Sequence, residues 1–223
     1  MSANRKFSIF LIAFFGCSLL AYFVMNGGAY WAILRYDVLL HSPFAPADLT
    51  TNTPILDVKT STEIRLATAS STKSVFGGGY ELIIPEIEIT TPIVAPQDNT
   101  TGGILASLED GVGIYPGSSD VGTTGRLILL GHSSRASWYR GQYAYVFALL
   151  SKLKPLDTFY IAGGGKKFTY QAFSVQTLSP TDTNAVLATT PSDSEVTLIT
   201  CYPVGSASNR TVVQAKLMSV ANI

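Results

Sequence analysis

The stretch EVTLITCYPVGSASNRTVVQAKLM (residues 195–218) contains two runs rich in β-branched residues, 195–201 and 211–218, on either side of Pro203 and Gly205. Such runs, when bounded by turn-forming residues, are typical of β-strands. Proline and glycine favour a turn, so the chain leaves the sheet after the first run and returns beside it. The stretch therefore predicts two neighbouring strands, with Cys201 at the end of one and Arg210 at the start of the next.

The sequence between residue 80 and this stretch repeats the same pattern. Short β-branched or aromatic runs alternate with Gly, Pro, Ser or Asp, and only segments 104–108 and 145–153 look helical. Many short strands with few helices favour an all-β dominated fold, in which the sheet closes or nearly closes into a barrel. The other predicted strands are residues 80–84, 87–91, 126–130, 158–162 and 167–175.

The N-terminus predicts a transmembrane helix. Residues 7–25 carry no charged side chain, and at about 1.5 Å rise per residue they span close to the roughly 30 Å hydrocarbon core. Arg5 and Lys6 precede the run, which favours a cytoplasmic N-terminus and an extracytoplasmic C-terminal domain. A cleaved signal peptide is the alternative, but its apolar core is usually shorter. Here apolar residues continue through Tyr30, Trp31 and Leu34, which favours an uncleaved anchor.

Residues 36–79 differ in composition from the segments on both sides. They are rich in Ser and Thr, contain several prolines and end in three glycines, and their apolar positions show no sustained period. We therefore expect an extended stalk. The predicted organisation is a cytoplasmic terminus (1–6), a transmembrane anchor (7–25), a juxtamembrane segment with a stalk (26–79), and a folded domain (80–223).

The composition excludes some classes of partner and bond. Lys plus Arg equals Asp plus Glu at 15 each, so no basic excess points to nucleic acid. The two cysteines cannot build a disulfide framework. Cys17 lies in the apolar run and is interpreted as a packing or lipid-facing residue, which leaves Cys201 as the candidate for chemistry.

Three strand-end residues form a candidate catalytic set. Taken alone, Cys201 is interpreted as a buried structural thiol. His132 is interpreted as a strand-end residue with its hydrogen bonds made inside the fold, and Arg210 as a solvated arginine. Together they offer the groups needed for acyl transfer. Cys201 is a nucleophile, His132 is an acid/base group that favours the thiolate form of that cysteine, and Arg210 is a cation that can stabilise a developing oxyanion. His132 is the only histidine of the predicted domain, because His41 lies in the stalk.

Several sequence motifs, which occur in the same order along the chain, resemble those of one protein family. Residues 197–201 read TLITC and are followed nine residues later by Arg210, which resembles the TLxTC and arginine signature of sortases. Gly131-His132 at the end of an apolar strand resembles the Gly-His motif of the same family. Further similar segments are LIIPEI (82–87), GVGIYPG (111–117) and residues 147–160, so the resemblance covers residues 80–218.

The resemblance implies a barrel of about eight strands and a cysteine transpeptidase with endopeptidase activity. Its substrate would be a C-terminal sorting peptide of the LPxTG type on secreted surface proteins. Cys201 would form a thioester with the substrate threonine, His132 would transfer protons, and Arg210 would hold the oxyanion. Thr200 would help to position substrate. The acceptor would be an amine on the cell wall or another surface protein, with no cofactor or metal, at the bacterial cell membrane.

Some interpretations remain open. An L,D-transpeptidase is another extracytoplasmic cysteine acyltransferase, although its arginine usually adjoins the cysteine, and a non-catalytic assembly factor could share the sortase scaffold. The aromatic residues Trp138 and Tyr139 either line the peptide groove or pack beneath the neighbouring helix. Some relatives bind calcium, but the spacing of four acids does not indicate a site, and they are interpreted as solvated: Asp98, Glu109, Asp110 and Asp120.

Overall fold

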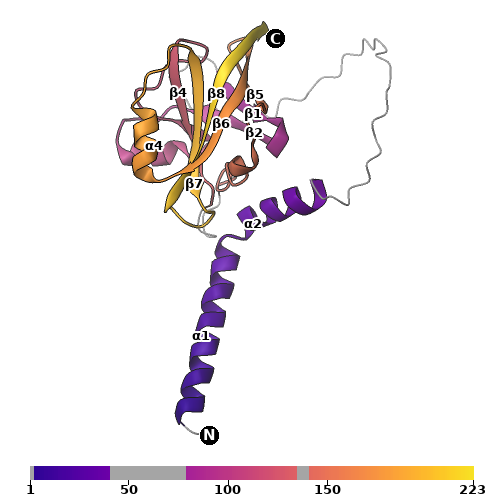
Figure 1. Cartoon of the computed structure of the whole chain (residues 1–223), viewed down its shortest axis with the longest axis vertical. Helices are drawn as coiled ribbons and strands as arrows, with labels where there is room; N and C mark the ends of the chain where they lie inside the picture. The colour runs from indigo at the N-terminus through magenta and orange to yellow at the C-terminus, as the bar shows by residue number, and fades with distance from the viewer. Residues whose placement is uncertain (1–2, 41–78, 135–140) are drawn as a thin grey trace, which may run out of the picture.

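The computed structural model describes residues 3–40, 79–134 and 141–223, which form an N-terminal helical arm and a β-barrel (Figure 1). Helix α1 (Ala3–Met25) includes Phe7–Met25, a span long and apolar enough to cross a membrane. Helix α2 (Gly27–Leu34) and the π-helical turn η1 (Arg35–Leu40) follow after Asn26. The predicted apolar helix is therefore present, and none of its span is buried against the barrel.

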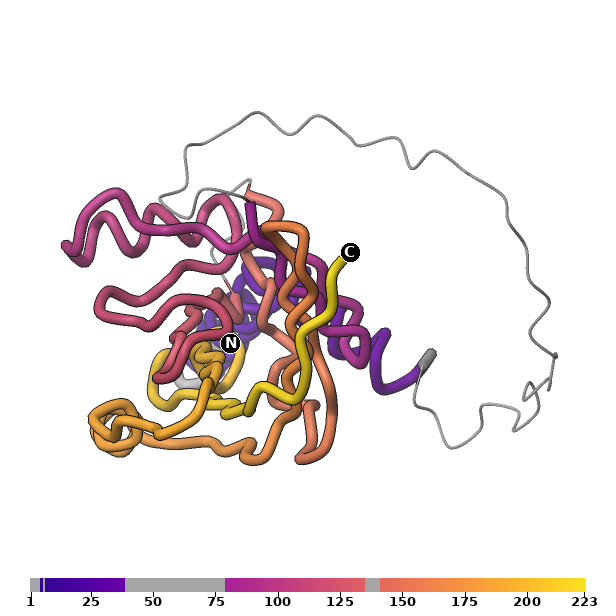
Figure 2. The backbone as a smooth tube through the Cα atoms, turned by 90° about the horizontal axis from the view of Figure 1, so that it is seen from above, coloured from indigo at the N-terminus to yellow at the C-terminus, as the bar shows by residue number. Residues whose placement is uncertain are grey.

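Eight strands close into the barrel in the order β1-β2-β3-β4-β7-β8-β6-β5. Figure 2 shows the path of the chain seen from above. The predicted all-β dominated, eight-stranded barrel is confirmed. Most neighbours are antiparallel, but β4 pairs with β7 and β2 with β3 in parallel. The strands are β1 (Tyr80–Ile84), β2 (Ile89–Val94), β3 (Val112–Ile114), β4 (Gly125–Leu130), β5 (Thr158–Gly163), β6 (Lys166–Leu178), β7 (Ser194–Tyr202) and β8 (Asn209–Asn222).

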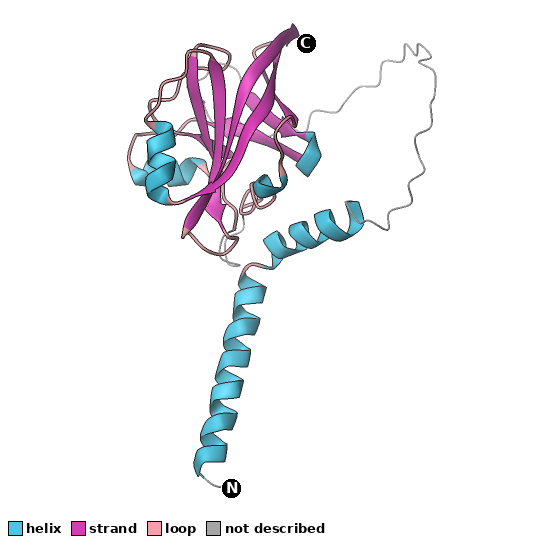
Figure 3. Ribbon diagram, viewed as in Figure 1, coloured by secondary structure: helices cyan, strands magenta, loops and turns pink. Residues whose placement is uncertain are grey.

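The helices depart most from the sequence prediction (Figure 3). The predicted helix over 145–153 is wrong: backbone bonds there run from residue i to residue i−3, and only η3 (Leu150–Lys152) is a regular 3₁₀ turn. Phe147 N instead donates to His132 O at 2.9 Å, which pulls this segment out of α-helical geometry. The predicted 104–108 helix begins earlier, as α3 (Thr101–Ser107), because Thr100 Oγ1 caps Gly103 N.

Helix α4 (Pro180–Leu187) was not predicted, although its start has a recognisable signature. Ser179 is the N-cap and accepts from Asp182 N at 3.1 Å, while Pro180 occupies the first turn. Ser, Pro and an acidic residue in this order are typical of a helix start. Strand β3 was also missed, because three residues are too few for an alternating pattern. The strand predicted at residue 87 begins at 89, after a 3₁₀ turn over Pro85–Ile87 (η2).

Helix α2 and η1, the part of the arm after α1, pack against the barrel, contrary to the extended stalk expected from residue 36. Tyr36 is buried in the main core, and Lys152 Nζ lies 2.6 Å from the carboxylate of Asp37. The core-facing residues Ala29, Ile33 and Tyr36 are four and three positions apart, which is helical spacing. This periodicity crosses the boundary at which the composition changes, so composition alone concealed it. The rest of the expected stalk, 41–78, lies outside the described residues.

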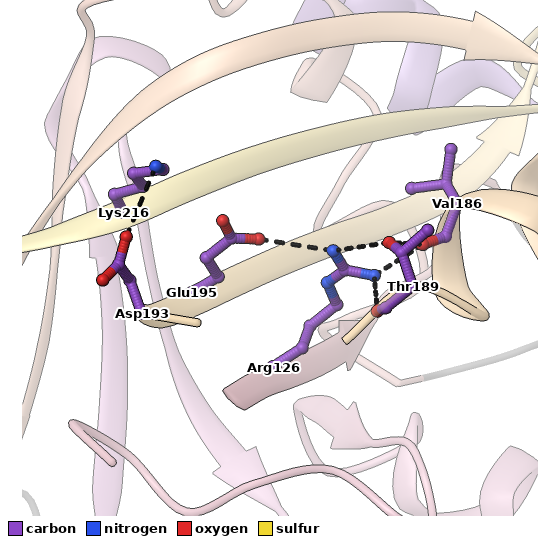
Figure 4. Close-up of polar contacts among 6 residues, drawn as sticks. All are labelled: Arg126, Val186, Thr189, Asp193, Glu195 and Lys216. Carbon is purple, nitrogen blue, oxygen red and sulfur yellow. Dashed lines mark hydrogen bonds and ion pairs between the residues drawn. The ribbon is translucent and has the colours of Figure 1, made fainter. Parts of the chain in front are cut away.

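A buried ion pair joins β4 to β7 and holds α4 against them (Figure 4). Arg126 and Glu195 are direct partners in the ladder, and their side chains are only 8% and 9% exposed. Arg126 Nη2 lies 3.3 Å from Glu195 Oε2, while Nη1 donates to Val186 O and Thr189 O, at the end of α4. Because α4 ends at this guanidinium, the segment between β6 and β7 is fixed to the sheet.

We predict that Arg126→Met destabilises the fold by about 3–5 kcal/mol, because it leaves the Glu195 carboxylate buried without its partner. The matched control is Lys216→Met. Lys216 pairs with Asp193 at 3.6 Å, also in Figure 4, but these side chains are 49% and 64% exposed. Loss of that surface pair should cost less than about 1 kcal/mol. Denaturant unfolding of the detergent-solubilised chain, followed by circular dichroism, measures both, and equal losses would contradict the prediction.

Candidate active site

Strand β7 brings Cys201 directly opposite Arg210. The two are Cα partners in the antiparallel β7–β8 ladder, and both side chains are half-buried. The intervening loop turns at Gly205, whose φ of 82° is one that L side chains rarely adopt. The sequence prediction of two adjacent strands with these residues at their facing ends is therefore confirmed by the fold.

The parallel ladder on the other side of β7 brings His132 to the same end. Leu130 pairs with Ile199, and Gly131 N donates to Ile199 O at 3.1 Å, one step beyond the last strand residue. Continuing this register by one further residue brings His132 level with Cys201. Histidine, cysteine and arginine thus occupy adjoining chain segments across β4, β7 and β8.

Cys201 and Arg210 belong to the outer face of the sheet, because side chains alternate along a strand. His132 lies two residues beyond the end of β4. Ile199 and Val212, two positions from Cys201 and Arg210, cluster with Ile128 outside the main core. Leu178 and Leu187, from the end of β6 and from α4, pack against this cluster. The candidate residues therefore adjoin an apolar floor that the segment between β6 and β7 partly covers.

Gly131 fixes the backbone before His132. A Cβ atom at this position would overlap the Phe147 ring, which is fully buried. Phe147 N also donates to the carbonyl of His132 at 2.9 Å. Only glycine allows this close approach, which explains in physical terms why Gly precedes His here.

Thr200 connects the two strands that carry His132 and Cys201. Its hydroxyl donates to Gly131 O at 2.8 Å, and the side chain is buried with 4% exposure. The loops beyond are also linked, since Gly205 N donates to Ser134 Oγ at 2.9 Å. These bonds hold the end of β4 and the end of β7 together.

The guanidinium of Arg210 is oriented by its own loop. Nη1 donates to Ala207 O at 2.9 Å and to Asn209 O at 2.8 Å. Both bonds use the same nitrogen, which leaves the donors on Nε and Nη2 for other acceptors.

A cleft of about 460 Å³ has Cys201 in its wall, whereas His132 and Arg210 do not line it. Tyr30 and Ile33 of α2 form one side, opposite barrel residues that include Phe147 and Thr211. These α2 residues were not predicted to line a site, because residues 26–79 were expected to form a juxtamembrane segment with a stalk. The helical spacing of Ala29, Ile33 and Tyr36 is the signal that could have identified a helix docked on the barrel.

Other candidate residues lie elsewhere. Trp138 and Tyr139 fall in 135–140, outside the described residues, so their expected role stays a prediction. Asp98 accepts bonds from the hydroxyl and backbone N of Thr100, and these hold the pKa of its carboxyl below the usual value. Glu109, Asp110 and Asp120 are exposed. In the part of the chain that the structure describes, no three His, Cys, Asp or Glu residues gather closely enough to hold a metal ion.

A protein-family model and solved structures point to the same family. The sortase domain model matches residues 82–218, more than half of the chain. No curated protein sequence gives a significant match.

Three solved structures illustrate the similarity. Sortase C-1 from Actinomyces oris is 30% identical with a TM-score of 0.53, over 63% of this chain and 73% of that one. Sortase A from Corynebacterium diphtheriae is 31% identical with a TM-score of 0.53, over 63% and 60%. Sortase C1 from Streptococcus suis is 26% identical with a TM-score of 0.53, over 64% and 73%. With its closed barrel and its matched domain, the chain belongs to the sortase family of cysteine transpeptidases.

Proposed function

We propose that this chain is a membrane-anchored sortase that cleaves an LPxTG-like sorting signal and transfers the protein to an amine on the cell surface. The observation that supports the proposal is the shared register of β4, β7 and β8: Cys201 pairs with Arg210, and the chain leaving β4 reaches His132 at the same end of the sheet. A nucleophile, a proton-transfer group and a cation at adjacent strand ends fit acyl transfer through a covalent intermediate.

The proposed reaction has two steps. In the first, the Cys201 thiolate attacks the carbonyl carbon of the substrate threonine, and the resulting tetrahedral intermediate collapses to a thioester. The peptide bond to glycine breaks, and His132 gives its proton to the departing amine. In the second step the acceptor amine attacks the thioester and loses a proton to His132. The new amide bond releases the Cys201 thiolate, so the enzyme returns to its starting state.

Arg210 is proposed to stabilise the oxyanion of both tetrahedral intermediates. Its Nη1 bonds to Ala207 O and Asn209 O pre-orient the guanidinium, so little rearrangement is needed when charge develops. Directly paired with Cys201 across the ladder, it lies beside the reacting carbonyl rather than at a distance.

The apolar floor supports a substrate with apolar residues before the scissile threonine. Ile199 and Val212 lie one side-chain step along the face from Cys201 and Arg210. Ile199 and Val212 are themselves buried, so the preceding residues of an extended peptide held at Cys201 would contact the half-buried side chains packed against them, which are Leu130, Leu178 and Leu187. The leucine and proline of an LPxTG-like signal suit such a surface.

We propose that Thr200 acts by positioning rather than by contacting substrate. A hydroxyl has one proton, and that of Thr200 is donated to Gly131 O in a buried bond. It therefore holds the His132 segment level with Cys201.

The proposed organisation in the bacterial cell membrane has a single pass. Residues 1–6 would lie in the cytoplasm, 7–25 in the bilayer and 80–223 outside, as the catalytic domain. The uncharged, unburied span Phe7–Met25 supports this, and so do the preceding Arg5 and Lys6. The packing of α2 and η1 on the barrel limits any stalk within 26–79 to the residues after Leu40.

The first prediction for this function concerns the two cysteines. An LPxTG peptide incubated with the detergent-solubilised chain should add the mass of its N-terminal fragment to Cys201, as a thioester that hydroxylamine releases. Cys201→Ala should abolish both the adduct and peptide cleavage. Cys17→Ala, on the exposed face of α1, is the control and should retain both. Cleavage that survives Cys201→Ala would refute the proposal, and full surface assembly with that variant would favour the non-catalytic assembly factor.

Replacement of Arg210 tests the oxyanion role. Arg210→Gln should lower kcat/KM by about 100- to 1,000-fold, in the range for loss of one oxyanion donor. The Arg210→Lys variant keeps the positive charge but loses the planar fork of donors, so its rate should be intermediate. Equal kcat in all three proteins, with only KM raised, would assign Arg210 to substrate binding alone.

Two threonines on β7 test the positioning role. Thr200→Val should cost about 1–3 kcal/mol of stability and lower kcat, because Gly131 O loses a buried donor, whereas Thr200→Ser should keep both. Thr197→Val is the matched control on the same strand: among the described residues the buried Thr197 Oγ1 has no hydrogen-bond partner, so its loss should be neutral or stabilising. Thermal unfolding and peptide cleavage measure these effects, and an equally harmful Thr197→Val would contradict the assignment.

A further inference from the structure

The helical arm formed by α2 and η1 has two faces of different kinds. On the barrel side, Ala29 and Tyr36 are buried with 2% and 6% exposure. Ile33 packs there with Ala148 and Val204, in a cluster separate from the main core. This face therefore contacts the barrel, although Ile33 also lines the cleft beside Cys201 and Tyr36 lines a second cavity of about 500 Å³.

The opposite face is an exposed apolar stripe, made of Trp31, Leu34 and Val38. Their exposures are 64%, 51% and 52%, and they are spaced by three and four residues. This spacing aligns them along one side of a helix. Trp31 also borders the cavity of about 500 Å³ between the arm and the barrel, so it lies at the edge of the stripe. In water such a stripe has no favourable partner, so the arm is apolar both on the side that packs on the barrel and on the exposed outward side.

The charged side chains of this segment are both committed to the barrel. Arg35 Nη2 lies 3.0 Å from Glu88 Oε2, and Lys152 Nζ lies 2.6 Å from Asp37 Oδ1. The ion pairs draw both charges to the flanks of the arm. No charged side chain of residues 27–38 therefore lies on the stripe.

The junction with α1 fixes where the stripe points. Tyr22 OH donates to Val204 O at 3.2 Å, and Tyr30 OH donates to Tyr22 OH at 2.9 Å. The end of the apolar span thus contacts the loop that follows Cys201. Figure 1 shows α2 turning sharply away from α1 beneath the barrel, so its outward side faces the end of the molecule from which α1 extends.

We propose that α2 and η1 lie in the headgroup region of the bilayer, with Trp31, Leu34 and Val38 directed toward the acyl chains. The barrel then rests on the membrane through this arm, with its Cys201 end turned toward the lipid surface. This inference rests on the membrane anchoring of the proposed function. A helix that directly follows a transmembrane span, with one side covered by the barrel and an exposed apolar outward side, is expected to lie at the membrane interface.

A bilayer fits the stripe better than a protein partner does. The stripe continues directly from a helix long enough to cross the membrane, so any bilayer holding α1 is already adjacent to it. Tryptophan is enriched at membrane interfaces, where Trp31 would lie. Three side chains also form a narrow strip, well short of the roughly 800 Å² per partner that stable protein interfaces bury.

Tryptophan fluorescence tests the proposal without reference to catalysis. The chain contains two tryptophans, so Trp138→Phe leaves Trp31 as the only one. We would reconstitute this full-length variant into phosphatidylcholine vesicles that carry bromine either near the carbonyl end or near the methyl end of the acyl chains. Trp31 should be quenched strongly by the shallow bromines and weakly by the deep ones, with emission blue-shifted from that of water-exposed tryptophan.

Two reporters in a Trp31→Phe, Trp138→Phe background serve as controls. Ile12→Trp, 73% exposed in the middle of α1, should be quenched by the deep bromines if α1 spans the bilayer. Ile223→Trp, also 73% exposed, lies at the C-terminus on the far side of the barrel and should not be quenched by either (Figure 1).

The outcomes separate this inference from the proposed function. Deep quenching at position 12 without quenching of Trp31 would overturn the interfacial arm and leave the anchor intact. Absence of quenching at both positions would overturn the anchoring as well. A blue-shifted Trp31 that no bromine quenches would mean that protein, such as a second copy of the chain, covers the stripe. None of these results depends on peptide cleavage, which the Cys201→Ala experiment tests separately.

Discussion

The parallel pairing of β4 with β7 is the constraint on which the candidate site depends. An antiparallel pair of consecutive strands places the end of one beside the start of the next, as β7 and β8 do for Cys201 and Arg210. Bringing His132 to the same place requires two strand ends to coincide, and only parallel strands do this. The chain between them is long, and it forms β5, β6 and α4 before it returns. The barrel is thus the means by which distant residues meet.

Much of the barrel could be predicted from local pattern. The runs at 80–84, 126–130 and 195–201 became strands with nearly the predicted bounds, because β-branched residues between turn formers leave few alternatives. The apolar spacing over 145–153 misled the prediction, since the same leucines pack equally well from successive 3₁₀ turns. The backbone hydrogen bond from Phe147 N to His132 O favours the 3₁₀ turns over an α-helix. A tertiary bond of this kind cannot be predicted from the spacing of apolar residues.

The candidate site also has a part that could be predicted from the sequence and a part that could not. Residue types and motif spacing pointed to Cys201, His132 and Arg210 as candidates, and the antiparallel ladder pairs Cys201 with Arg210. The wall contributed by Tyr30 and Ile33 could not be identified by composition, because the docking of α2 depends on barrel residues far away in sequence, such as Ala148 and Val204. Sequence motifs point to the candidate reacting groups, whereas the boundary of the cleft beside Cys201 depends on how the N-terminal arm packs.

The buried pair of Arg126 and Glu195 has a consequence for how this domain can vary. Arg126 precedes His132 by six residues, and Glu195 precedes Cys201 by six. A single insertion or deletion in either span would shift one strand end by a residue and turn its side chain to the other face. The ion pair at the far end of the ladder would then have to break for the reactive ends to realign. Length changes in these two spans are therefore tolerated only in matched pairs, whereas the loops beyond them can lengthen independently.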